Sequence, residues 1–152
     1  MWFSRKQLVK SPDGKVEAPP AGAPTTHGTT KRRGDAAEAT ALHYLVKAGL
    51  KLVETNYRTP GRGGGEIDLI MRAPDGTLVF VEVRQRSGQS HGGAGASISG
   101  LKQQRIIYAA RHYLMRFASL PPCRFDVVLV QGGLAAGEGA HIEWLQAAFD
   151  AS

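Results

Sequence analysis

The 152-residue chain has a single cysteine, Cys123, and no long apolar run. One cysteine excludes a disulfide within the chain and a zinc site built from cysteines, so we expect a small core or surface residue in a reducing compartment. Apolar stretches near the N-terminus, such as Leu8-Val9, are too short for the core of a signal peptide or for a membrane span. We therefore expect a cytoplasmic protein that does not enter a membrane.

Internal repeats, a nucleotide-binding P-loop and a pair of histidines at metal-ligand spacing are also missing. These absences argue against a repeat protein, a P-loop nucleotide-binding protein and a histidine metal centre. With 42% hydrophobic and 7% aromatic residues, the chain has the composition of one ordinary domain that can bury a core.

Two neighbouring strand-like segments, residues 65–70 and 80–84, carry acidic side chains. The turn between them, Ala-Pro-Asp-Gly at 73–76, has Pro and Gly at the positions that a type I turn with a bulge requires. Pairing Ala73 with Thr77 then sets the register of the hairpin. One face receives three opposed pairs: Asp68 with Glu82, Glu66 with Arg84, and Ile70 with Phe80. The other face receives five apolar residues: Ile67, Leu69, Val79, Val81 and Val83.

The opposed carboxylates of Asp68 and Glu82 would repel each other, because cross-strand side chains lie only about 5 Å apart. A divalent cation, Mg²⁺ or Mn²⁺, would compensate, since both prefer carboxylate and carbonyl oxygens. The alternative is an acidic pair on a solvated face, with Glu66 and Arg84 forming an ion pair across the strands. A two-residue turn would also shift the register by one residue and separate the carboxylates.

Periodicity and turn residues predict an α/β fold with the element order αβββαβ and one further short strand. We expect a first helix from an Asp35 cap to about Ala48 and a second from a Ser99 cap to about Ser119. The expected strands are 51–58, 65–72, 78–85, 124–131 and 141–146. A three-strand meander followed by a helical crossover should give a mixed sheet flanked by helices.

Residues 1–33 hold seven basic and two acidic residues, so this segment carries +5 of the net charge of +6. Its Ala- and Pro-rich part cannot bury enough apolar surface to offset chain entropy, so we expect a disordered basic tail. Such a tail either adds non-specific affinity for phosphates or is a solvated extension. The domain, residues 34–152, is nearly neutral.

Taken together, the segments 65–70 and 80–86, Lys102 and the motif 124–127 resemble the YraN family of small bacterial proteins. The resemblance runs from about Gly34 to Phe149. It implies a PD-(D/E)XK, restriction-endonuclease-like fold, close to the archaeal Holliday-junction resolvases. It also implies a metal-dependent nuclease site that acts on DNA, and it leaves a homodimer open.

Glu38 has two interpretations. Three residues after Asp35, it could be the acid of a capping box at the start of the first helix. It also shares a helical face with Ala41, Leu42 and Leu45, which should press on the sheet. By resemblance to related nucleases, a first-helix glutamate completes the metal site, and the Val83 carbonyl is a further ligand.

The second helix has an apolar side and a line of basic residues that includes Lys102, Arg105 and Arg116. Solvated side chains explain this line about as well as contacts to phosphates do. Lys102 matches a lysine of the family. Together with Arg86, which directly follows the third predicted strand, these residues are our candidates for nucleic-acid binding.

Arg84 stands where the nuclease superfamily has a lysine. Because guanidinium stays protonated, Arg84 cannot act as a general base, but it can hold a phosphate oxygen. Two functions follow: a metal-dependent DNA endonuclease with Asp68, Glu82 and Arg84 as catalytic residues, and a nucleic-acid-binding module without turnover. The sequence leaves open DNA versus RNA, the branch structure and the choice of metal.

Overall fold

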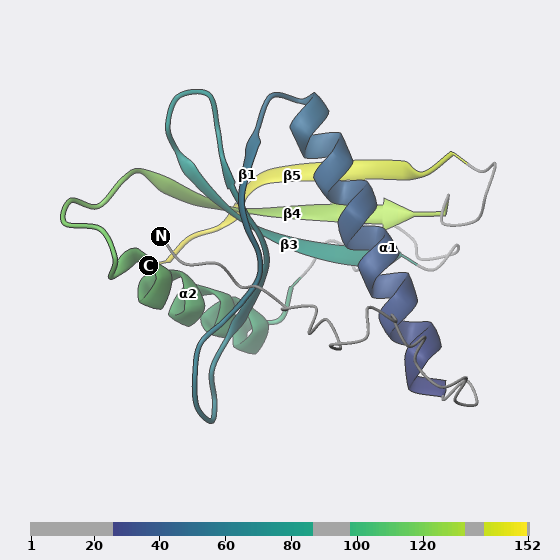
Figure 1. Ribbon diagram of the computed structural model, residues 1–152, viewed down its shortest axis with the longest axis horizontal. Coiled ribbons are helices and arrows are strands. Elements are labelled where there is room, and N and C mark those ends of the chain that lie inside the picture. Colours follow the sequence, from purple (N-terminus) through teal and green to yellow (C-terminus); the bar gives the residue numbers. More distant parts are fainter. Residues whose placement is uncertain (1–25, 87–97, 133–138, 152) are drawn as a thin grey trace, which may run out of the picture.

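The computed structural model describes residues 26–86, 98–132 and 139–151. Five strands form one sheet in the order β1-β2-β3-β4-β5 (Figure 1). Their bounds are Lys51–Arg58, Glu66–Arg72, Leu78–Arg86, Cys123–Gln131 and His141–Phe149. β3 and β4 run parallel, and the other neighbours are antiparallel. The predicted α/β mixed sheet and its αβββαβ order are therefore confirmed.

Helix α1, Thr26–Lys47, begins nine residues before the predicted cap. Asp35 lies inside the helix, so its predicted role as the N-cap is wrong, and α1 crosses the expected boundary between tail and domain. The helix can continue through Gly34 because an interior glycine weakens a helix by only about 1 kcal/mol. Residues 1–25 of the predicted tail lie outside the described residues.

The C-terminal end of α1 is where the sequence places it. Gly49 has a φ of +105°, and its N–H donates to the Val46 carbonyl at 3.0 Å. The Leu50 N–H donates to the Leu45 carbonyl at 3.1 Å. These two bonds form a glycine-dependent helix stop, which turns the chain directly into β1.

Helix α2, Gly100–Leu114, is capped by Ser99, whose Oγ accepts a hydrogen bond from the Lys102 N–H at 3.2 Å. The predicted cap is thus confirmed, whereas the predicted end at Ser119 is wrong. After Leu114 the chain tightens, since the N–H groups of Met115, Arg116 and Phe117 bond to carbonyls three residues back. Such bonds end an α-helix without a glycine.

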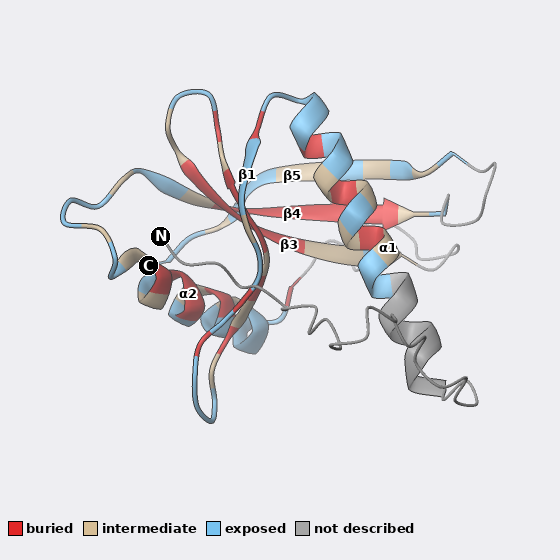
Figure 2. Ribbon diagram, viewed as in Figure 1, coloured by how far each residue is buried: buried red, intermediate tan, exposed pale blue. Residues whose placement is uncertain are grey.

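The helices cover opposite faces of the sheet (Figure 1). The α1 face packs Ala37, Ala41 and Leu45 against a set of sheet residues that includes Leu69, Val79, Val81, Val128 and Val130. The α2 face packs Ile106, Ala110 and Tyr113 against a second set that includes Ile70, Phe80 and Phe125. Burying each large apolar side chain contributes roughly 1.5–3 kcal/mol, which makes the central strands the stable part of the fold (Figure 2).

The predicted hairpin register is confirmed where the strands pair. Ile70 lies opposite Phe80, and the Ala73 N–H donates to the Thr77 carbonyl at 2.9 Å. Ile67 is an exception, because it packs on the α2 face with Ile70 instead of on the α1 face. The pairing with β3 ends at Leu69, so the alternation of β2 is no longer held by that ladder at Ile67.

The motif at 124–127 has a structural role, because it contains a buried carboxylate that binds neighbouring segments. Asp126 is fully buried in β4 and accepts hydrogen bonds from Arg124 Nε at 3.1 Å, Trp144 Nε1 at 2.9 Å and the Ala147 N–H at 2.9 Å. Ala147 has a φ of +49° in an irregular part of the β4–β5 pairing. Asp126 therefore holds β5 to β4 at a bulge.

Across the described ranges, no helix is both long and apolar enough to cross a membrane. Cys123 is exposed at the start of β4.

Candidate metal and nucleic-acid site

The candidate site forms where β2 and β3 stop pairing. Residue pairs extend from Arg72 and Leu78 to Leu69 and Val81. At the next position the Asp68 carboxylate enters the space between the strands, and its Oδ2 accepts a hydrogen bond from the Val83 N–H at 2.8 Å. A side chain thus replaces a main-chain partner, and the local separation of the strands holds Asp68 in a fixed position.

Glu82 is the most unusual side chain of the site. It is 7% exposed, and its Oε1 lies 3.3 Å from Lys102 Nζ, whereas its Oε2 is buried without a hydrogen-bond partner. Burial, followed by the charge of Asp68, raises the pKa of Glu82 to about 8, and Lys102 opposes this rise. A buried oxygen without a partner is costly unless a cation or a proton occupies the space beside it.

Asp68 and Glu82 lie close enough for each to influence the pKa of the other, although the β2–β3 pairing that was predicted to oppose them ends one residue earlier, at Leu69 and Val81. Burial raises the pKa of Asp68, and the hydrogen bond from the Val83 N–H opposes this rise. Both carboxyl groups therefore hold a proton more readily than usual, as expected for two acids that share a poorly hydrated space.

Glu38 approaches Asp68 from α1. Burial, followed by the charge of Asp68, raises the pKa of Glu38 to about 7. Because α1 begins at Thr26, Glu38 is not in the first turn, and the capping-box interpretation is wrong. Its helical neighbours Ala41 and Leu45 are fully buried, so Glu38 points toward the sheet as its spacing indicates.

Asn56 is a member of the site that the sequence analysis missed. Its side chain lies beside the Glu38 carboxyl group and lowers the pKa of that group. It lies in β1 between the residues opposite Leu69 and Ile67, which places it level with Asp68, and it has a φ of +51°. Asn tolerates this left-handed conformation better than most residues. The signal in the sequence that could have identified this residue is an Asn within a segment predicted to be a strand.

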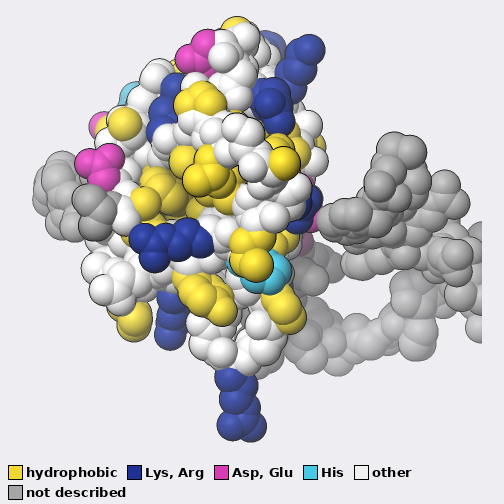
Figure 3. Space-filling model, turned by 90° about the vertical axis from the view of Figure 1, so that its left-hand side faces the viewer, with side chains coloured by type: hydrophobic (Ala, Val, Ile, Leu, Met, Phe, Trp, Pro, Cys, Tyr) yellow, Lys and Arg dark blue, Asp and Glu magenta, His cyan; other side chains and the backbone are white. Residues whose placement is uncertain are grey.

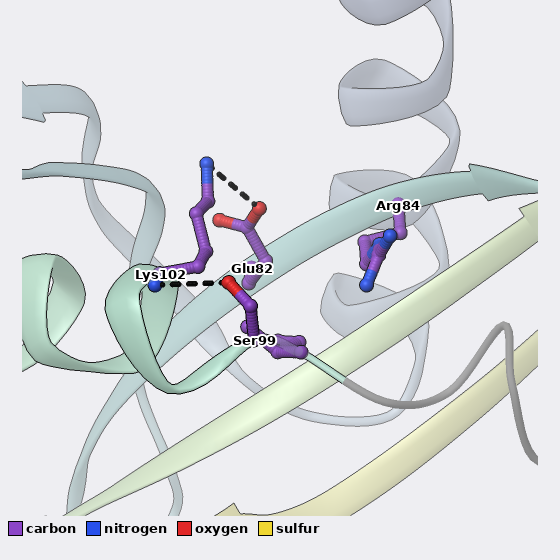
Figure 4. Close-up of a pocket in the computed structure, with 5 residues that line it drawn as sticks. Glu82, Arg84, Ser99 and Lys102 are labelled. Carbon is purple, nitrogen blue, oxygen red and sulfur yellow. Dashed lines mark hydrogen bonds and ion pairs between the residues drawn. The ribbon is translucent and has the colours of Figure 1, made fainter.

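The site has two openings, one beside Glu38 and one beside Glu82. On the α1 side, a groove of about 260 Å³ is lined by residues that include Glu38, Asn56 and Leu69. On the α2 side, a pocket of about 360 Å³ is lined by Glu82, Arg84, Ile98, Ser99 and Lys102. Figure 4 shows Lys102 and Glu82 pointing toward each other, with Arg84 farther along β3.

Arg84 lines the pocket, but its predicted pairing with Glu66 is not part of the β2–β3 ladder, which ends at Leu69 and Val81. Glu66 instead forms an exposed ion pair with Arg58 of β1, with 3.4 Å between Oε1 and Nη2. The prediction of a Glu66–Arg84 pair was wrong in this respect, because the strands separate before they reach it.

Two of the four predicted nucleic-acid-binding residues lie elsewhere. Arg86 is 14% exposed and pairs with Glu143 of β5 at 3.4 Å. Arg116 follows the end of α2, where its guanidinium lies 3.8 Å from the centre of the Tyr113 ring. The side chains of Arg86 and Arg116 therefore make contacts within the fold. Lys102 lies at the pocket, and the side chain of Arg105 is exposed on α2.

The carboxylates of the candidate site fit a hard divalent cation. Mg²⁺ is usually held by one or two carboxylates and keeps several waters, and Asp68 and Glu82 offer such a pair. The unpartnered Glu82 Oε2 is an oxygen that a cation would satisfy. Within the described residues, no three His, Cys, Asp or Glu side chains form a group that could hold a metal ion. Glu38 and the Val83 carbonyl therefore stay predicted ligands.

Comparison with known proteins identifies the family of the chain. Residues 37–130, which include every candidate site residue named above, match the uncharacterised protein family UPF0102. A UPF0102 protein from Polaromonas naphthalenivorans (strain CJ2) is 72% identical, with all of both chains aligned. One from Methylibium petroleiphilum is 65% identical over 82% of this chain and 98% of the relative. The chain therefore belongs to UPF0102, which is the YraN family that its motifs resemble.

Proposed function

We propose that the protein is a metal-dependent endonuclease that hydrolyses phosphodiester bonds in DNA, with branched or single-stranded structures as substrates. The observation that supports this most is the buried, unpartnered oxygen of Glu82 beside Asp68, in a pocket that also contains a lysine. Acids kept close together with raised pKa values are typical of functional sites.

The residues of the candidate site divide into two chemical groups. Asp68 and Glu82 would hold Mg²⁺ or Mn²⁺, with Glu38 and the Val83 carbonyl as further ligands. When bound, the metal would activate a water molecule and neutralise charge on the reacting phosphate.

Two cations of the pocket would bind and orient the phosphate. The Lys102 ammonium, already 3.3 Å from Glu82, can donate to a phosphate oxygen at the edge of the site. Arg84 cannot take a proton from water, but a guanidinium on the same pocket wall can stabilise charge that develops on phosphate oxygens.

The proposal is tested with labelled branched, duplex and single-stranded DNA, each incubated with Mn²⁺, Mg²⁺ or a chelator. We expect cleavage with metal only, strongest on branched or single-stranded DNA. Asp68→Asn and Glu82→Gln, purified in the same way, control for contaminating nucleases and should abolish cleavage. Equal cleavage by these variants would refute the site, and binding without cleavage by the wild type would refute the enzyme.

One observation favours a second function, a nucleic-acid-binding module without turnover. The Lys102 ammonium already lies 3.3 Å from Glu82 Oε1, so a cation of the protein occupies a place beside the oxygen that a metal would bind. In that case Lys102→Ala would strengthen metal binding without producing cleavage. If the protein is an enzyme, the same substitution should lower cleavage at saturating metal.

A further inference from the structure

Two segments of the domain contain basic residues and no acids. Residues 34–152 contain twelve basic and eleven acidic residues, yet neither α2 nor the segment 57–65 contains an acid. These two segments together carry five basic residues: Arg58, Arg62, Lys102, Arg105 and Arg111. Arg58 is paired with Glu66 at 3.4 Å, but the other four basic residues have no acid within these two segments, and such a local excess of positive charge attracts a polyanion.

The two segments are held against each other by Gly65. A Cβ added at Gly65 would lie 1.8 Å from the backbone oxygen of Arg105 and 3.2 Å from the Ala109 Cβ, so only glycine allows this approach. Thr59 closes the other end of the loop, because its Oγ1 accepts from the Gly65 N–H at 2.7 Å. The β1–β2 hairpin therefore has a fixed base on α2 and projects beyond that helix (Figure 1).

Two cations of this region are available to a ligand. Arg62 at the loop and Arg105 on α2 are exposed, and neither makes an ion pair or a side-chain hydrogen bond to the described part of the chain. Lys102, one turn before Arg105, reaches the candidate site through Glu82. The cations thus form a line that leads from the pocket across α2 to the β1–β2 loop.

An exposed aromatic ring lies beside this line. Tyr108 is 55% exposed, and it is three residues from both Arg105 and Arg111, which makes all three neighbours on the helix surface. Figure 3, a view from the end where α2 lies, shows Lys and Arg side chains interspersed with hydrophobic ones. An aromatic ring between cations can stack on an unpaired base while the cations hold the backbone, whereas a duplex offers phosphates but no free base.

We propose that the outer face of α2 and the β1–β2 loop form a binding track for an unpaired nucleic-acid strand that continues from the candidate site. Arg62 and Arg105 contact its phosphates, and Tyr108 stacks on one of its bases. The inference rests on the proposed function only for the identity of the ligand as nucleic acid. It deepens that function by assigning selectivity for unpaired strands to Tyr108.

Binding is measured by fluorescence anisotropy with a labelled single strand and with the matching duplex, both in chelator so that metal and cleavage play no part. Arg62→Ala combined with Arg105→Ala should weaken both ligands and lower the slope of log affinity against log salt by about 1.4 to 1.8. Lys47→Ala, which removes an exposed cation from the last turn of α1, is the matched control and should change neither.

Tyr108→Ala should weaken single-strand binding at least about fivefold, because stacking on one base contributes roughly 1 kcal/mol or more. Tyr108→Phe, which keeps an aromatic ring, should bind the single strand like the wild type. Neither substitution at Tyr108 should change binding to the duplex. An equal loss for single strand and duplex, or no loss for either, would overturn the role of Tyr108. A loss with Lys47→Ala as large as that of the arginine variant would overturn the track.

The two proposals fail in distinguishable ways. If the arginine and tyrosine variants bind like the wild type while Glu82→Gln abolishes cleavage, the track is wrong and the enzyme stands. If the wild type never cleaves but the track variants lose binding as expected, the enzyme is wrong and the track stands.

Discussion

Glu82→Gln tests the carboxylate pair by protein stability alone. Burial, followed by the charge of Asp68, raises the pKa of Glu82 from its ordinary value of 4.5 to about 8. The folded state therefore holds this proton more tightly than the unfolded state does. In chelator, the wild type should be most stable below about pH 4.5 with respect to this group and should lose stability as the pH rises toward 8.

The size of the loss has an upper limit set by the shift. One unit of pKa corresponds to about 1.4 kcal/mol, so the shift bounds the loss at about 5 kcal/mol. Water and side-chain movement reduce such penalties, and we expect roughly 2 kcal/mol, or about 4–8 °C in melting temperature for a chain of this size. Glutamine has no charge to lose, so this part of the pH dependence should disappear. Glu38 also has a raised pKa, of about 7, so a smaller pH dependence of stability, weakened by solvent screening, should remain in both proteins.

The assay is a melting curve at several pH values between about 5 and 9, with chelator and with Mn²⁺. Metal at about 100 times its dissociation constant should stabilise the wild type by about 2.7 kcal/mol, and Glu82→Gln should remove most of this gain. Asp150→Asn, which removes an exposed acid after β5, is the matched control and should behave like the wild type. The reasoning is refuted by a wild type whose stability does not change with pH, or by an undiminished Mn²⁺ effect in Glu82→Gln.

Three further predictions concern other parts of the chain. Arg84→Lys should keep or increase cleavage and Arg84→Ala should lower it, and equal rates in all three proteins would make Arg84 a structural residue. Deleting residues 1–25, which carry four basic and two acidic residues and precede α1, should weaken DNA binding and flatten its salt dependence, with unchanged cleavage at saturating DNA. Gly65→Ala should destabilise the fold by about 1–3 kcal/mol in a denaturant titration, because the added methyl group collides with the backbone of α2. Gly34→Ala, in open space on α1, should instead stabilise it slightly, and equal losses would argue against the close contact.

Features fixed by local chemistry could be predicted from the sequence. The Pro and Gly of the β2–β3 turn determine its register, and the confirmed pair Ile70 and Phe80 follows from that turn alone. Gly49 and Ser99 end and begin helices through bonds to residues three to five positions away. Because such signals involve near neighbours, a single sequence contains them.

Features fixed by distant partners could not be predicted in this way. Arg86 resembles a surface cation in the sequence, yet its partner Glu143 is 57 residues away on β5. Asn56 belongs to the site only because α1 brings Glu38 beside it. The start of α1 was missed for another reason, since a strong N-cap residue such as Asp35 can also lie inside a helix.

The carboxylate cluster lowers the stability of the fold instead of contributing to it. Glu38 reaches Asp68 from the α1 side of the sheet, whereas Lys102 reaches Glu82 from the α2 side, so helices on both faces converge where β2 and β3 separate. Continued pairing of these strands with apolar residues would satisfy the backbone and bury more apolar surface. The structure instead keeps acids with raised pKa values and one unpartnered oxygen there. A stable core tolerates such a local conflict, and conflicts of this kind are expected at the positions that bind or react.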